Sequence, residues 1–130
     1  MGKIILTTTL MILFGIAAAD AANLSVSFKW GKTPACSSGY PSIVNSPAFK
    51  VRHVPKGTKM LRFRITDLDV PSYPHGGGTV KYRRKSRIPA GSFRYTGPCP
   101  PVPHTYYWSV EALGSGGKVL AKGGARRGFP

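Results

Sequence analysis

Alternation of apolar and polar residues is the clearest pattern along this chain, and it predicts β-strands. The stretches 24–30, 60–66 and 104–113 place apolar side chains at every second position, which is the period of a strand with one buried face. In the third stretch we expect Tyr106 and Trp108 to face the core. No segment keeps a helical period over three turns, so the pattern favours an all-strand core.

The rest of the chain reads as short strands and long loops. Residues 49–53 and 79–82 can pair briefly, and 118–122 can form a hairpin return or a short helix. With 16 glycines and 12 prolines in 130 residues, we expect a mainly β fold: a small antiparallel β-sandwich with long Gly/Pro-rich loops and little helix. The expected loops are 31–47, 67–78 and 89–103.

The N-terminus has the composition of an export signal. Lys3 precedes an apolar run that is shorter than the ~20 residues of a membrane-spanning helix. Small residues at Ala19 and Ala21 suit a signal peptidase, so we predict a signal peptide over 1–21 and a single domain over 22–130. A retained anchor or a buried helix is the alternative. Export would make the protein periplasmic or secreted.

Positive charge dominates the composition. The chain has 19 Lys and Arg against 4 Asp and Glu, a net charge of +15, and loss of Lys3 and Asp20 on export would leave that value unchanged. Such a chain attracts phospholipid headgroups, phosphate-bearing metabolites and polyanions. The dense basic cluster is 81–87. It is either a solvated loop or a docking patch for an anionic membrane surface or an acidic protein partner.

Cys36 and Cys99 are the two cysteines of the chain. In an oxidising compartment an even pair is more often bridged than free, so export favours a disulfide between them. Two separate buried thiols are the alternative. A bridge over so long a loop would be worth roughly 4 kcal/mol if it is unstrained.

Two predicted loops carry the polar groups of a small-anion pocket. Carboxylate, imidazole, phenol and backbone amides can together hold an anion, and prolines reduce the entropy lost on binding. Each feature also has a purely structural reading, since an aspartate can cap a turn and a loop histidine can simply be solvated. The candidate side chains are Asp67, Asp69, His75, His104 and Tyr106.

The order of the motifs resembles the phosphatidylethanolamine-binding protein (PEBP) family, and most closely its bacterial Raf-kinase-inhibitor-like branch. The resemblance spans most of the predicted domain. It implies a β-sandwich with an anion pocket at one end that binds phosphate-like headgroups, without cofactor or established turnover. The matching stretches are Ser46-Pro47-Ala48-Phe49, Asp67-Leu68-Asp69-Val70-Pro71, Gly97-Pro98-Cys99-Pro100-Pro101, His104-Thr105-Tyr106 and Glu111-Ala112-Leu113.

The resemblance assigns roles to single positions. Asp67 matches the first acid of the family's aspartate loop and Pro71 its closing proline. Asp67 would orient a histidine or accept from an ammonium group, and Asp69 could share this role. His104 and Tyr106 match the His-x-Tyr element that enters the pocket-lining strand.

One further match and two departures from the family pattern remain. Gly97 and Pro98 match the loop that forms the pocket wall. His75, followed by three glycines, stands in for the histidine that typical members place at the start of a strand. The chain also lacks the family's C-terminal helix and ends in 123–130, which predicts a more open pocket.

The sequence therefore favours a non-catalytic binding protein for a small anion or a phospholipid headgroup. The alternative is a protein-interaction or inhibitor module that acts on an acidic partner protein or enzyme. We do not expect catalysis, because Asp67, His104 and Ser72 lack the context of an activated nucleophile. A metal site is disfavoured by the absence of paired ligand spacing. Nucleic-acid binding would rest on charge alone and does not suit an exported protein.

Overall fold

The computed structural model describes Gly2 and residues 23–130. Apart from Gly2, the predicted signal peptide and its cleavage site lie outside the described residues. No helix within the described part is both long and apolar enough to span a bilayer. The elements, in chain order, are β1 (Ser25–Lys29), β2 (Ile43–Asn45), β3 (Ala48–Arg52), β4 (Met60–Asp67), β5 (Gly77–Lys81), β6 (Arg87–Ile88), β7 (Arg94–Thr96), β8 (His104–Leu113), the 3-10 helix η1 (Ser115–Gly117) and β9 (Val119–Phe129).

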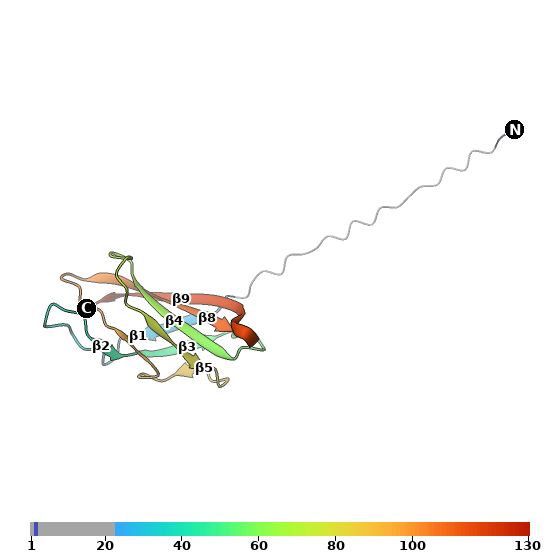
Figure 1. Ribbon diagram of the computed structural model, residues 1–130, viewed down its shortest axis with the longest axis horizontal. Helices are drawn as coiled ribbons and strands as arrows, with labels where there is room; N and C mark the ends of the chain where they lie inside the picture. Colours follow the sequence, from blue (N-terminus) through green and yellow to red (C-terminus); the bar gives the residue numbers. More distant parts are fainter. Residues whose placement is uncertain (1, 3–22) are drawn as a thin grey trace.

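The strands form a four-stranded sheet in the order β5-β4-β8-β9, a three-stranded sheet in the order β1-β3-β6, and the pair β2-β7. All of these strand pairs are antiparallel. The two larger sheets lie face to face (Figure 1). The mainly β sandwich expected from the sequence is confirmed.

The core fills the space between the two larger sheets. Phe49 of the three-stranded sheet has its ring centroid 4.6 Å from that of Phe63 and 5.1 Å from that of Trp108, both on the four-stranded sheet. All three side chains are almost fully buried. Tyr106 and Trp108 face inward as their alternation predicts. Burial of large apolar side chains from both layers is what holds the sheets together.

The structure corrects two of the predicted loops and adds a short strand that was not predicted. β2 and β7 pair within the segments expected to be irregular, and β6 adds a two-residue edge to β3. Such strands are too short to show alternation, and they exist because distant backbone groups pair with them. Ser46 N, for example, donates to Phe93 O at 2.8 Å. Their formation depends on tertiary contacts that no local pattern encodes.

The segment after η1 is a hairpin return, which was one of the two expected outcomes. Strand β9 continues through the glycine-rich end of the chain to Phe129 and pairs with the whole of β8. Glycine is required in this strand, because a Cβ at Gly124 would collide with the Tyr107 hydroxyl. The strand therefore passes close to β8 only because those positions have no side chain.

Candidate functional site

The end of β4 and the start of β8 form one end of the sandwich, where antiparallel pairing sets Asp67 opposite Tyr106. A cavity of about 200 Å³ opens there. It is bounded by the loop after β4, the loop before β8 and the loop before β2. The residues that line it are Pro41, Asp67, Val70, Tyr73, His75, Cys99, Pro100, Pro101, His104 and Tyr106.

Asp67 is buried and fully engaged by the protein. One carboxylate oxygen, Oδ1, accepts from the amides of Asp69 and Val70 at 2.9 and 3.2 Å, and Oδ2 accepts from His104 Nδ1 at 2.7 Å. Burial alone would raise the pKa of Asp67, but these three hydrogen bonds outweigh it and hold the pKa below its usual value. Asp67 is thus an ionised turn cap that also orients His104.

A second contact fixes the aspartate loop against β8. The backbone amide of Thr105 donates to Asp69 Oδ2 at 2.8 Å, and the Thr105 carbonyl accepts from the Leu68 amide at 2.8 Å. Asp69 itself does not line the cavity. Its observed contact is structural, since it holds the loop that positions Asp67.

His75 is held between β4 and β7. Its Nδ1 donates to the Thr96 carbonyl at 2.8 Å, and its own carbonyl accepts from the Thr96 amide at 3.0 Å. The ring is buried, with its centroid 4.7 Å from Tyr73 and 5.5 Å from Tyr106. Because a carbonyl can only accept, Nδ1 carries a proton and Nε2 is left without a protein partner among the described residues.

The three glycines after His75 are needed by the local path of the chain. Gly76 adopts φ 78°, a left-handed conformation that favours glycine. A Cβ at Gly77 would collide with the Phe63 carbonyl, and one at Gly78 would lie 2.6 Å from Phe93. The glycines therefore let β5 lie close to β4 directly after the buried histidine, which keeps His75 in the cavity wall.

His104 and Tyr106 supply two further polar groups to the cavity. Since Asp67 accepts from Nδ1, His104 also leaves Nε2 without a protein partner in the described part of the chain. Burial and the neighbouring Asp67 carboxylate raise the pKa of the Tyr106 hydroxyl. The phenol therefore stays protonated near neutral pH and can act as a hydrogen-bond donor.

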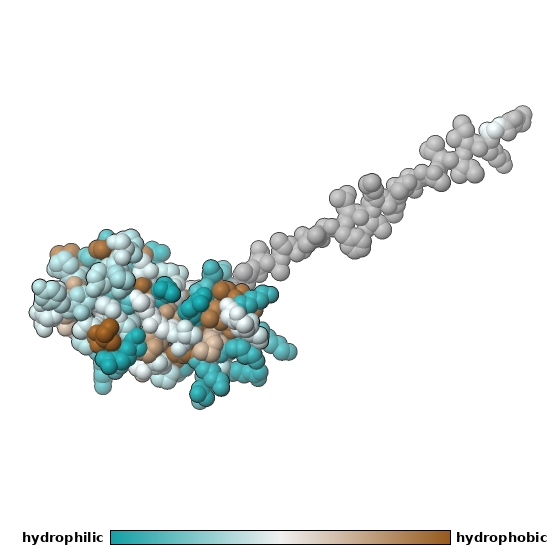
Figure 2. All heavy atoms as spheres, in the orientation of Figure 1, coloured by the Kyte–Doolittle hydropathy of each residue, from teal (hydrophilic) through white to brown (hydrophobic). Residues whose placement is uncertain are grey.

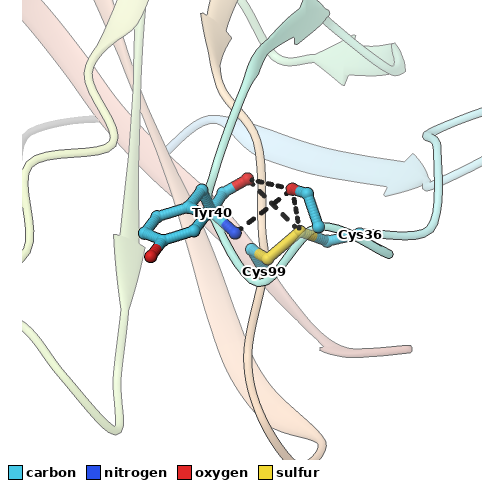
Figure 3. The surroundings of a disulfide bond; sticks show 4 residues. Cys36, Tyr40 and Cys99 are labelled. Atoms are coloured by element: carbon cyan, nitrogen blue, oxygen red, sulfur yellow. Dashed lines mark hydrogen bonds between the residues drawn. A yellow bond between two sulfur atoms is a disulfide. The ribbon is translucent and has the colours of Figure 1, made fainter.

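The disulfide between Cys36 and Cys99 forms as predicted, and it joins the loop before β2 to the loop before β8 (Figure 3). Ser38 secures the same loop, since its hydroxyl accepts from the Tyr40 amide at 3.2 Å and donates to the Tyr40 carbonyl at 3.0 Å. Cys99 lines the cavity beside Pro100. The bridge thus builds one wall of the cavity as well as linking the two loops.

Exposed apolar side chains surround the cavity mouth. They lie on the three loops that bound it, next to or among the lining residues, and they are 40 to 80 % exposed. Figure 2 shows apolar patches at the end that carries β2 and again at the opposite end of the sandwich, and hydrophilic side chains project around β5. Among the described residues, the large exposed hydrophobics elsewhere are Ile43 and Val119. We call the set at the mouth the apolar rim: Tyr40, Leu68, Val70, Tyr73 and Val102.

The structure brings together four of the eight residues predicted for the ligand site: Asp67, His75, His104 and Tyr106 line the cavity. The other four do not line it. Pro71 is exposed beyond the aspartate turn, and Gly97 and Pro98 are buried behind Cys99. The wall that the family resemblance assigned to Gly97 and Pro98 is formed by the three residues that follow them.

Sequence reasoning missed other residues of the lining. Tyr73 lies two residues before His75 in a loop that already carried predicted site residues. Its closeness to His75 in the sequence could have marked it as a lining residue. Pro41 offered no signal, because it reaches the cavity only through the disulfide and the β2-β7 pairing.

Asp67, Asp69 and His104 could form a cation site by distance, because their ligating atoms lie within 4.8 Å of one another. Their hydrogen bonds argue against that use. Both oxygens of Asp67 and one oxygen of Asp69 already accept from nitrogen donors, which a metal ion would have to displace.

Comparison with protein-family models gave no match, and curated proteins gave none. Among solved structures, the chain is similar in fold to a PEBP homologue from Chlamydia trachomatis, with a TM-score of 0.54 and 20% sequence identity. The match covers 66% of this chain and 81% of that chain. It confirms the PEBP-like sandwich that the motifs implied. Placement in the bacterial Raf-kinase-inhibitor-like branch stays a prediction.

Proposed function

We propose that this protein is a non-catalytic binding protein for a phosphate-bearing headgroup. The observation that carries the proposal is that both cavity histidines use Nδ1 within the protein and leave Nε2 facing no protein partner among the described residues. In both His75 and His104, Nδ1 is engaged by a protein acceptor at 2.7–2.8 Å. Nε2 is therefore the nitrogen that each ring offers to a ligand, and the Tyr106 hydroxyl adds a hydrogen-bond donor.

The chemistry of these groups suits a phosphate. When Nδ1 is protonated, Nε2 donates to a phosphate oxygen only if the ring carries the second proton of an imidazolium. Charge-assisted hydrogen bonds contribute ~1.5–3 kcal/mol each. Two or three of them correspond to an affinity between about millimolar and micromolar for a small phosphate compound.

The apolar rim favours a lipid-borne headgroup over a free ion. A small soluble ligand in the cavity would leave the apolar side chains of Tyr40, Leu68 and Val102 exposed to water. Beside a bilayer, tyrosine and aliphatic side chains can lie at the boundary between headgroups and acyl chains. The rim therefore supports a phospholipid headgroup as the physiological ligand.

Three further features complete the proposal. The disulfide supports an oxidising compartment, and with the predicted signal peptide it favours a periplasmic or secreted protein. Among the described residues that line the cavity there is no serine, threonine, lysine or free thiol, which disfavours covalent catalysis through those four nucleophiles. The motifs at 67–71 and 97–101 support placement in the bacterial Raf-kinase-inhibitor-like branch.

The test uses asparagine variants, because asparagine can retain a donor near the position of Nδ1 while Nε2 is removed. We expect His104→Asn and His75→Asn each to weaken calorimetric binding of phosphoethanolamine by roughly 10- to 100-fold. His53→Asn is the matched control, because His53 is exposed in the turn after β3 and does not line the cavity. Equal affinity in all four proteins, with circular dichroism unchanged, would refute the proposed site.

A further inference from the structure

The outer face of the three-stranded sheet is a second charged surface, separate from the cavity. Inward residues of β1 and β3 alternate with outward ones, and the outward residues are cationic or small. The basic segment between β5 and β6 adjoins this face, as does Arg127 of β9. We call the resulting set the cationic face: Lys29, Lys50, Arg52, Lys81, Arg83, Lys85, Arg87 and Arg127.

Grooves run along this face and meet at one strand. One, of about 660 Å³, is lined by Lys29, Lys50, Arg87 and Arg127 together with serine and apolar residues. The other, of about 550 Å³, is lined by Lys81, Arg83, Lys85 and Arg87, with Thr79 and Ser92. Both include Arg87, Ile88 and Pro89, so β6 lies between them. Neither shares a residue with the headgroup cavity.

No acid balances these cations. The carboxylates of 23–130 are Asp67, Asp69 and Glu111, and they lie on the four-stranded sheet or the loop after it. The ion pairs among the described residues are formed by Arg62, Lys122 and His104 with these acids. The cationic face is therefore left to solvent and to whatever anion binds it.

The sheet register makes this charge costly to the fold. Lys50 lies directly opposite Arg87 across the β3-β6 pair, and Arg52 is two residues along the same face. Like charges directly opposite each other destabilise a sheet. The Lys50–Arg87 pair has no compensating acid and lowers the stability of the sheet. Sequence choices that lower stability in this way are expected at functional surfaces.

The face also excludes other kinds of partner. None of the large exposed hydrophobics lies on it, so it lacks the apolar groups that insert into a bilayer. Its aromatic neighbours Phe28 and Phe49 are buried in the core, and Tyr82 of the basic segment is partly buried against it, so the face offers little stacking surface for single-stranded nucleic acid. Hydroxyls at Ser25, Ser27 and Ser92 lie among the cations instead.

We infer that the cationic face binds an extended acidic glycan, a chain whose sulfate, phosphate or carboxylate groups pair with the cations while its hydroxyls meet the serines. The grooves would hold the chain along β6. Arg127 is already positioned for this, because its Nε donates to the Phe28 carbonyl at 2.5 Å and its terminal nitrogens remain available. None of the residues that line the two grooves lines the headgroup cavity.

The probe is a size-fractionated heparin oligosaccharide, with neutral dextran as the uncharged comparison. We expect wild type to bind heparin, and the combined variant Lys50→Gln, Arg52→Gln and Arg87→Gln to bind it roughly 10- to 100-fold more weakly with a shallower salt dependence. The matched control is Arg64→Gln, Lys118→Gln and Arg126→Gln. It removes the same charge from exposed positions away from the cationic face and should bind nearly as wild type does.

Two further readouts keep the test decisive. Heparin should raise the melting temperature of wild type and of the control but not of the cationic-face variant, and all three should bind phosphoethanolamine equally. Equal weakening in both triple variants would overturn the inference, because binding would then follow net charge. Tighter binding of phosphatidylglycerol-containing vesicles or of oligo-dT than of heparin, through the same three residues, would overturn the glycan assignment.

Discussion

The Asp67 carboxylate uses both of its oxygens within the protein, and this is what links the turn after β4 to the histidine of β8. One oxygen caps the turn through two amides and the other orients the His104 ring. The turn cap that is the structural reading of an Asp-x-Asp loop is therefore present here, and the same carboxylate also orients a cavity histidine. The cap gives the ring a fixed tautomer, and the fixed tautomer leaves Nε2 to the cavity.

Asp67 makes stability depend on acid pH. Its pKa lies below 3.8 in the folded protein, so on acidification the unfolded chain takes up this proton first. The stabilisation is present above about pH 4 and is lost as the pH falls through the folded value. We expect Asp67→Asn to flatten the fall in unfolding free energy between pH 4 and pH 2.5, measured by urea titration.

The matched control for this prediction is Asp69→Asn, because the Asp69 carboxylate accepts a single hydrogen bond, from the Thr105 amide. It should retain most of the acid dependence of wild type. If Asp67→Asn and wild type lose stability in parallel over this range, the carboxylate is not held ionised by its three donors.

Four of the eight residues predicted for the ligand site line the cavity, and all four carry polar side chains, although Asp69, which is equally polar, does not line it. Asp67, His75, His104 and Tyr106 carry groups whose reactivity is visible in the sequence, and each lines the cavity. Gly97 and Pro98 carry no such group and were placed by resemblance alone. Contacts made by the backbone or by small apolar side chains depend on exact chain path, which residue identity does not report.

Among the elements, loops rather than strands set the shape of the cavity. The strands provide the platform at the end of β4 and the start of β8, and three loops close around it. The disulfide ties two of these loops across a sequence separation of 63 residues. The positions of these two loops therefore depend on whether Cys36 and Cys99 are oxidised to the disulfide.

Replacing both cysteines by serine should destabilise the fold and loosen the cavity. A crosslink over this separation contributes roughly 4 kcal/mol by restricting the unfolded chain. We expect Cys36→Ser with Cys99→Ser to lower the melting temperature and to weaken phosphoethanolamine binding, since Pro41 and Pro100 lose their fixed positions. Calorimetry checks both. Unchanged affinity in the folded variant would show that the bridge serves stability alone.

Long strands were predictable and short ones were not. β4 and β8 alternate over eight and ten residues, enough for the period to stand out. β2, β6 and β7 have two or three residues each and are held by partners far away in the chain. β9 is long but was not predicted over its full length, because its glycines interrupt the alternation of apolar and polar residues.

The whole molecule separates two kinds of surface. Lys81, the first residue of the basic segment, pairs with Met60. Met60 lies at the opposite end of β4 from Asp67. Seven residues of strand span ~23 Å, which exceeds the ~8 Å screening length at physiological salt. The cavity and that segment therefore act on their ligands independently, and net charge alone does not describe the protein.

The most direct test of the headgroup site is a nuclear magnetic resonance titration of the imidazole nitrogens with phosphoethanolamine. We predict that the Nε2 signals of His75 and His104 move saturably toward the imidazolium form, with one dissociation constant, while those of His53 stay in place. Amide signals should move around the cavity and not along the cationic face. Saturable binding that leaves the nitrogens of both cavity histidines unchanged would contradict the account.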